Sequence, residues 1–112
     1  MRFEVFLIED ANRDLEDIYA YVAEHDAPGK AEALLDRIEE IIGRLSANPD
    51  RGYYPKELSA LGIREYRQVF YKPYRIIYSV SGKRVYIYLI PDGRRDFQTL
   101  LARRLLSSGT GT

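Results

Sequence analysis

The feature that most restricts the fold of this chain is a series of strand-like segments in its second half. From Ile63 onward the sequence reads IREYRQVFY, YRIIYSV and RVYIYLI, three runs rich in β-branched and aromatic residues. They are separated only by Lys72-Pro73 and by the Ser-Gly-Lys sequence at 81–83. Links this short allow hairpin turns but not the longer crossovers that parallel strands need. The second half therefore predicts a meander of three antiparallel strands.

The first half predicts a strand followed by two helices. The run Arg2–Ile8 is short and rich in β-forming residues. Apolar residues then recur at helical spacing, first as far as His25 and again after the break DAPGK at 26–30. Asp10 and Asp26 are the expected N-caps of the two helices. We expect these helices to form a hairpin.

The remaining segments complete the predicted element order β-α-α-β-β-β-α. A loop without regular structure is expected over 50–62, where Pro55 and two glycines interrupt the pattern, and a short basic helix capped by Asp96 follows the meander. The fold class is α+β, with a mostly antiparallel four-stranded sheet, the helical hairpin on one face and the opposite face open. A chain of 112 residues supports one core. We expect a single domain over 1–106 and a disordered tail over 107–112.

Arg75 places a permanent positive charge inside the second of the three strands. Strand alternation directs one set of side chains toward the expected core: Tyr74, Ile76, Tyr78 and Val80. Arg75 then faces the open side, where Arg64 or Arg67 is expected beside it, depending on the strand register. Clustered guanidinium groups suit the bidentate capture of phosphate or carboxylate. The competing interpretation is an internal ion pair of Arg75, for instance with Glu65 or Asp96.

The neutral net charge of the chain conceals two halves of opposite charge. Residues 1–50 hold 13 acidic and 5 basic side chains, and residues 51–112 hold 4 acidic and 12 basic ones. A basic half of this kind attracts acidic partners. The alternative is that the acidic helices neutralise the basic sheet within the molecule.

The residue inventory excludes several classes of chemistry. The sequence has no cysteine, and its only histidine, His25, ends an acidic helix, so thiolate and histidine metal sites and Ser-His-Asp catalysis lack their components. No glycine-rich phosphate-binding motif occurs. We expect neither a metal nor another cofactor. Acidic residues follow the N-terminus too soon for a signal peptide and no apolar run reaches roughly 20 residues, so a cytoplasmic protein is expected, without a membrane partner.

Two short patterns stand out in the C-terminal half, Tyr-Arg-x-x-Tyr at Tyr74–Tyr78 and Gly-Arg-Arg-Asp at Gly93–Asp96. With these patterns and its order of elements, the chain resembles the ParE/RelE superfamily of bacterial type II toxin-antitoxin toxins. The similarity extends from Arg2 to about Leu106. It implies the RelE/ParE-like fold for the whole domain.

The two branches of this superfamily imply different activities. Resemblance to ParE implies a protein that binds and poisons DNA gyrase and needs no catalytic group. Resemblance to RelE implies cleavage of ribosome-bound mRNA, in which Arg75 and Arg95 match two arginines of the site. If the chain is RelE-like, the candidate catalytic residues are Arg75, Arg95, Arg64, Arg67 and Lys72. The tyrosine that often completes the RelE site is missing from 97–101, and Asp92 stands where many members carry a histidine.

We therefore interpret the chain as a ParE-type toxin that is not an enzyme. The alternatives are a RelE-like mRNA endonuclease and a non-toxic basic binding module. The residues expected to contact the target or another anion are Arg64, Arg67, Arg75, Arg94 and Arg95. The resemblance also implies a cognate antitoxin that docks on apolar grooves beside the helices and forms a hetero-oligomer with the toxin. The residues expected to contact it are Leu15, Tyr19, Leu35 and Ile42.

Overall fold

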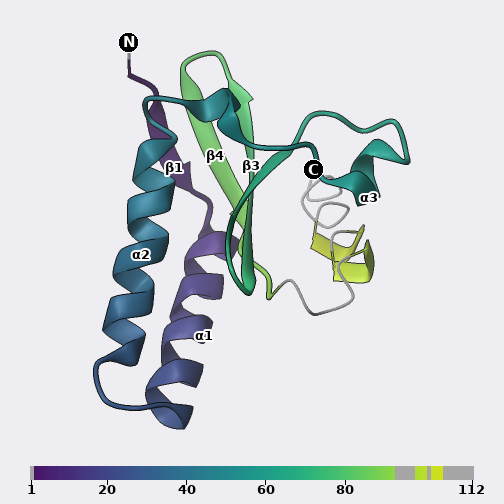
Figure 1. Cartoon of the computed structure of the whole chain (residues 1–112). Helices are drawn as coiled ribbons and strands as arrows, with labels where there is room; N and C mark the ends of the chain where they lie inside the picture. The colour runs from purple at the N-terminus through teal and green to yellow at the C-terminus, as the bar shows by residue number, and fades with distance from the viewer. Residues whose placement is uncertain (1, 93–97, 101, 105–112) are drawn as a thin grey trace.

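The chain forms a sheet with a long helical hairpin packed against one of its faces (Figure 1). The computed structural model describes residues 2–92, 98–100 and 102–104. Its helices are α1 Glu9–His25, α2 Lys30–Arg44 and the short α3 Lys56–Ser59, with a 3-10 turn η1 at Pro49–Arg51. Its strands are β1 Glu4–Leu7, β2 Arg67–Tyr71, β3 Tyr74–Ser81 and β4 Arg84–Leu89. Residues 98–100 and 102–104 are also helical.

The strands lie in the order β1-β4-β3-β2. β2, β3 and β4 pair antiparallel in the expected meander, and β1 lies parallel to β4 at one edge. The α1–α2 hairpin carries the chain from β1 across the sheet to β2 at the opposite edge, which is why β1 and β4 can run in the same direction. The predicted α+β class and mostly antiparallel sheet are confirmed.

The main core lies between the helical hairpin and one face of the sheet. Ile76 and Tyr78 of β3 are completely buried there, together with Ile38 of α2. Val80 was expected in the same core, but it is 39% exposed. β2 begins opposite Tyr78, so Val80 has no neighbouring strand on that side.

Both predicted helix caps are wrong. Asp10 lies inside α1, and α2 begins after Gly29, whose φ of +85° is in the left-handed region that glycine adopts without steric cost. Asp26 ends α1 instead, since its N–H donates to the Val22 carbonyl at 3.0 Å. Its side chain accepts a hydrogen bond from the Ala27 N–H at 2.8 Å, so the carboxylate is used in a local turn.

The opposite face of the sheet is partly covered, which corrects the expectation of an open face. Leu58 of α3 packs there against Ile77 and Leu89, which are both completely buried. Segment 63–66 was expected to begin the first strand of the meander, but Ile63 and Tyr66 pack against this same cluster and β2 begins later. Packing against the sheet therefore overrides the strand preference of this segment.

The loop expected over 50–62 is more regular than predicted. It contains the end of η1 and the whole of α3, and an isolated bridge pairs Tyr53 with Gln68 of β2. The Tyr53 N–H donates to the Gln68 carbonyl at 2.9 Å, and the Gln68 N–H donates to the Tyr53 carbonyl at 2.7 Å. Elements this short depend on tertiary contacts, so sequence periodicity does not reveal them.

The described part of the chain contains no helix with the length and apolar character needed to cross a bilayer. The expected cap Asp96 and the tail over 107–112 lie outside the described residues. The extent of the single domain, 1–106, stays a prediction.

Candidate functional site

A carboxylate and an amide bind the side chain of Arg75. The expectation that this side chain projects freely from the open face of the sheet is therefore wrong. The Nη1 and Nη2 atoms of Arg75 donate to Glu57 Oε2 and Oε1, both at 3.1 Å, and its Nε donates to Gln68 Oε1 at 2.9 Å. The side chains of Arg75 and Glu57 are only 11% and 18% exposed. An internal ion pair therefore forms, with a partner that the sequence did not suggest.

Glu57 reaches Arg75 because α3 lies over the sheet. Leu58, the next residue, packs against Ile77 and Leu89 and so fixes the short helix in place. The ion pair consequently lies beside a small apolar cluster, where water screens charges less than it does at the surface.

The Arg75 guanidinium shifts the titration of Glu57. Burial by itself would raise the pKa of the Glu57 carboxyl, but hydrogen bonds from Arg75 and from the backbone, with the positive charges of Arg75 and Lys56, lower that pKa below its ordinary value of 4.5. Glu57 is therefore ionised at neutral pH, and its charge compensates that of Arg75.

The strand register separates Arg67 from Arg75. Arg67 pairs with Tyr78, on the face that carries the main core, whereas Arg75 pairs with Phe70 on the other face. The Arg67 guanidinium lies 4.5 Å from the centre of the Tyr54 ring, and that of Arg64 lies 5.4 Å from it. The structure thus brings Arg64 and Arg67 together around Tyr54 and leaves Arg75 apart. Arg94 and Arg95 lie outside the described residues.

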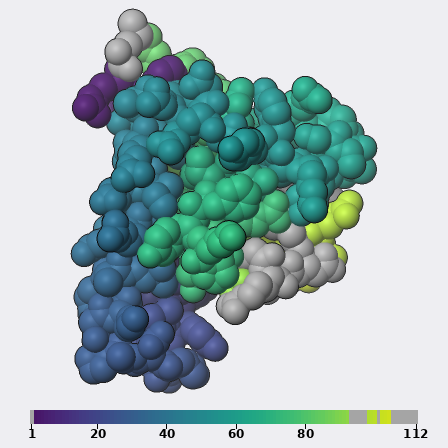
Figure 2. Space-filling view, in the orientation of Figure 1, coloured from purple at the N-terminus to yellow at the C-terminus, as the bar shows by residue number. Residues whose placement is uncertain are grey.

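Lys72 and Arg75 line a broad groove along the edge strand β2. The groove has a volume of about 670 Å³ and includes the aromatic side chains of Tyr53 and Phe70, which are 70% and 47% exposed. Figure 2 shows this green edge of the sheet between the blue helical hairpin and the teal segment that carries α3. Exposed aromatic residues beside an edge strand are typical of contact surfaces.

Three of the four residues expected to contact an antitoxin line one groove between α1 and α2. Leu15, Tyr19 and Leu35 lie together there in a groove of about 410 Å³. Ile42 does not line this groove, and its side chain packs in the main core. The Tyr19 hydroxyl donates to Glu32 Oε1 at 2.6 Å and ties the two helices together at the groove.

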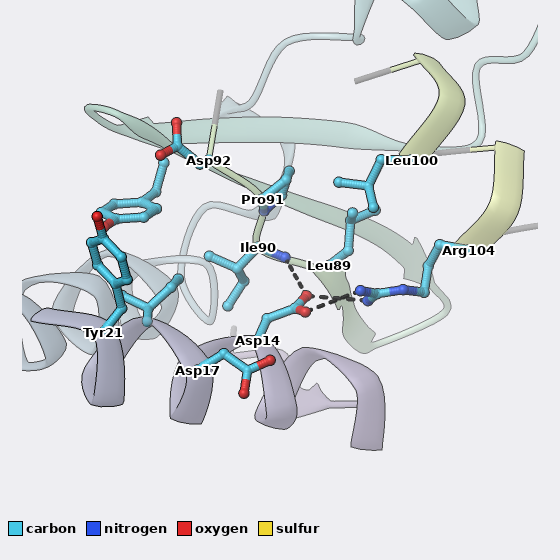
Figure 3. A pocket seen from close by; sticks show the side chains of 11 residues that line it. Asp14, Asp17, Tyr21, Leu89, Ile90, Pro91, Asp92, Leu100 and Arg104 are labelled. Carbon is cyan, nitrogen blue, oxygen red and sulfur yellow. Dashed lines mark hydrogen bonds and ion pairs between the residues drawn. The ribbon is translucent and has the colours of Figure 1, made fainter. Parts of the chain in front are cut away.

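A second ion pair, which the sequence analysis missed, joins the C-terminal helical residues to α1 (Figure 3). Arg104 Nη1 and Nη2 donate to Asp14 Oδ2 and Oδ1 at 3.1 and 3.0 Å. Asp14 Oδ2 also accepts the Ile90 N–H at 2.9 Å. One carboxylate therefore connects α1, the end of β4 and the C-terminal helical residues.

The sequence does contain a signal for Asp14. It follows Ala11 by three residues and precedes Ile18 by four, so it lies at the edge of the apolar face of α1. A carboxylate at such a position is half-buried and needs a partner. For Glu57 no comparable signal exists, since no periodic pattern surrounds it.

The only histidine in the sequence has a local role. His25 Nδ1 lies 2.9 Å from the Tyr21 carbonyl oxygen, and its ring stacks on the Tyr21 ring with the centres 4.3 Å apart. No group of three or more histidine, aspartate or glutamate residues that could hold a metal occurs within residues 2–92, 98–100 and 102–104.

Two comparisons with known proteins point to one family. The model of the family described as ParE toxin of the type II toxin-antitoxin system parDE matches residues 5–97. Toxin ParE3 of Caulobacter vibrioides is 33% identical over 91 residues, which cover 81% of this chain and 87% of that protein.

Two solved structures share the fold. The chromosomal ParDE toxin-antitoxin system of P. aeruginosa gives a TM-score of 0.68 at 20% identity and covers 81% of this chain and 96% of the other. The RelBE2 toxin-antitoxin complex of Mycobacterium tuberculosis gives a TM-score of 0.60 at 20% identity and covers 82% and 99%.

Proposed function

Because this chain belongs to the ParE toxin family of type II toxin-antitoxin systems, we propose that it stops bacterial growth by binding DNA gyrase, without catalysing a reaction. The toxin acts through surface complementarity to its target protein, and the result is an inhibited target and arrested cell growth. The proposal places the toxin in the cytoplasm, where gyrase works.

One observation carries the choice of a binder over a nuclease. Arg75, the strand arginine that a RelE-like site would use to hold the substrate phosphate, is neutralised by Glu57 and hydrogen-bonded to Gln68. Phosphate-ester cleavage needs positive groups directed at the developing charge and a positioned group that transfers a proton. An arginine that is engaged with an internal carboxylate meets the first requirement poorly, which favours binding without catalysis.

The groove between α1 and α2 is the proposed docking site of the cognate antitoxin. Leu15, Tyr19 and Leu35 supply its apolar surface, and Glu16 and Glu39 stand at its margin. Burial of the apolar side chains supplies most of the affinity, and the two carboxylates favour a segment with basic residues beside its apolar ones. Both solved relatives named above are described as toxin-antitoxin systems or complexes.

The decisive experiment compares two purified targets. The chain is added to DNA gyrase in a supercoiling assay and to translating ribosomes in an mRNA cleavage assay, each with and without the antitoxin. Loss of supercoiling, reversed by the antitoxin and with mRNA intact, is the expected result. Cleaved mRNA with normal supercoiling would replace the proposal with the RelE-like function.

Induction of the chain alone should also stop bacterial growth, and unimpaired growth would contradict an active toxin.

A further inference from the structure

A polar groove lies where β3 extends beyond the beginning of β2. It has a volume of about 470 Å³. Its walls come from the loop before β2, the beginning of β2 and the ends of β3 and β4, and they include Tyr54, Arg64, Glu65, Arg67, Val80 and Tyr88. It is on the sheet, away from the groove between α1 and α2 that is proposed for the antitoxin.

Two arginines in this groove are oriented by one aromatic ring. The guanidinium groups of Arg64 and Arg67 lie 5.4 and 4.5 Å from the centre of the Tyr54 ring. Arg67 also donates through Nη1 to the Asp50 and Gly52 carbonyls and through Nη2 to the Tyr54 hydroxyl. These hydrogen bonds fix the Arg67 side chain, but their acceptors are uncharged. The Nε–H of Arg67 donates to none of these acceptors. Arg67 thus keeps its full charge and spare donors.

The contrast with Arg75 and Arg104 is the first argument for a ligand. Arg75 is paired with Glu57 and Arg104 with Asp14. Within the part of the chain that the structure describes, neither Arg64 nor Arg67 lies within ion-pair distance of a carboxylate. Glu65 lines the same groove but pairs with neither of them. Two uncompensated guanidinium groups beside one tyrosine ring attract an external anion.

The backbone of Val80 supplies a second, independent observation. The backbone N–H and C=O of Gln68 both bond to Tyr53, on the outer side of β2. Backbone groups of neighbouring strand residues point to opposite sides, so those of Arg67 point toward its partner Tyr78 in β3. Val80 lies two residues beyond Tyr78, so its N–H and C=O point to the β2 side of β3, as those of Tyr78 do. No β2 residue lies opposite Val80. Among the described residues these two groups have no hydrogen-bond partner. They face the groove as a short unpaired strand edge.

We propose that this groove receives an extended, acidic segment of the toxin's protein target. The segment adds to β3 by pairing its backbone with Val80, and a carboxylate side chain of the segment binds between Arg64 and Arg67. Tyr54 and Tyr88 contact the segment from the sides. A nucleic acid also carries anionic groups for the arginines, but a peptide strand presents a C=O and an N–H at the spacing of the Val80 N–H and C=O, and for that reason the observations favour a peptide. This inference rests on the proposed function as a binder of a protein.

The side-chain part of the proposal is tested with labelled peptides and the full chain. One short peptide alternates threonine with glutamate, and the other has glutamine in place of glutamate. By fluorescence anisotropy the glutamate peptide should bind about tenfold more tightly, with a difference that shrinks at high salt. Arg64→Ala should lose this preference. Arg13→Ala is the matched control, since Arg13 is 66% exposed on α1, and it should keep the preference. Equal affinities for both peptides, or an unchanged preference in Arg64→Ala, overturn the proposal.

The backbone part is tested by hydrogen exchange at a single amide. Exchange of the Val80 N–H should slow when the glutamate peptide binds, and an unchanged rate overturns strand addition. A single-stranded RNA of equal charge serves as the competing probe. Tighter binding of the RNA than of the peptide would identify nucleic acid as the ligand and overturn the choice of a protein segment.

Failure of this inference is distinguishable from failure of the proposed function. The wild-type chain tests the function in the gyrase assay, and Arg64→Ala tests the groove in the same assay. If both inhibit supercoiling equally, the groove is not the target site although the function stands. If only the wild type inhibits, and Arg64→Ala still binds the antitoxin, both proposals are supported. If the wild type fails to inhibit, the proposed function falls, whatever the peptides show.

Discussion

The guanidinium group of Arg75 and the carboxylate of Glu57 face each other through two hydrogen bonds of 3.1 Å, although 18 residues separate them in the sequence. Arg75 belongs to the inner strand β3 and Glu57 to a helix of four residues. So short a helix is unstable alone, and the ion pair is one of the contacts that hold it on the sheet.

Removal of either partner should destabilise the fold, because the other charge is left half-buried without its counterpart. Arg75→Ala and Glu57→Ala are each expected to lower the free energy of unfolding by about 1–3 kcal/mol. The double variant should lose clearly less than the sum of the two single variants. Urea denaturation measures all three, and strictly additive losses would contradict a direct interaction.

The ion pair should also make stability depend on pH. The pKa of Glu57 is lowered in the folded protein, so its contribution is complete above the ordinary value of 4.5 and is lost as the pH falls through the lowered value. Unfolding free energies of wild type and Glu57→Gln are measured from neutral to acidic pH. The advantage of the wild type should shrink only below about pH 4.5. An advantage that stays constant down to pH 2 would show that ionised Glu57 contributes nothing.

Gly52 should not tolerate even a methyl group. A Cβ atom there would overlap the Tyr78 hydroxyl and would lie 2.7 Å from the Gln68 carbonyl oxygen. We expect Gly52→Ala to lower the free energy of unfolding by about 1–3 kcal/mol. Gly43→Ala is the control, because a Cβ on this α2 residue meets nothing within 4 Å, and it should stabilise by about 0.5–1 kcal/mol. Thermal unfolding separates the two, and equal midpoints would refute the steric argument.

Loss of the Asp14 carboxylate should release several contacts at once. Asp14→Ala leaves the Arg104 guanidinium and the Ile90 N–H without this acceptor, at an expected cost of about 2–4 kcal/mol. Asp17→Ala is the matched control on the same helix, since Asp17 is exposed, and it should change stability by less than about 0.5 kcal/mol. Urea denaturation of the two variants provides the measurement, and similar losses would argue against the Asp14 network.

Neutralisation by the antitoxin should depend on Leu35. Leu35→Asp puts a third acidic side chain into the groove between α1 and α2, beside Glu16 and Glu39. Co-expression of the antitoxin should then no longer rescue growth, whereas the variant alone stays toxic. Leu61→Asp is the control, because Leu61 is 63% exposed outside this groove, and it should still be rescued. Full rescue of Leu35→Asp would place the antitoxin elsewhere.

Much of the fold follows from local patterns in the sequence. Alternation predicted the burial of Ile76 and Tyr78, and helical spacing predicted α1 and α2. Each of these features repeats with the period of its element, so neighbouring residues carry the information. The resemblance to the ParE/RelE superfamily, not the spacing, suggested Leu15, Tyr19 and Leu35 as antitoxin contacts; the structure brings these three residues into one groove, and the contact itself stays a prediction.

The sequence by itself determined which segments form strands and long helices and most of their apolar faces, because hydrophobic periodicity and turn chemistry act over a few residues. Only the tertiary structure decided which charges are compensated. Arg75 finds Glu57, and Arg104 finds an acceptor 90 residues away, while Arg67 is turned to the other face by the strand register. Such pairings depend on the distance between segments in space, which local preferences do not set.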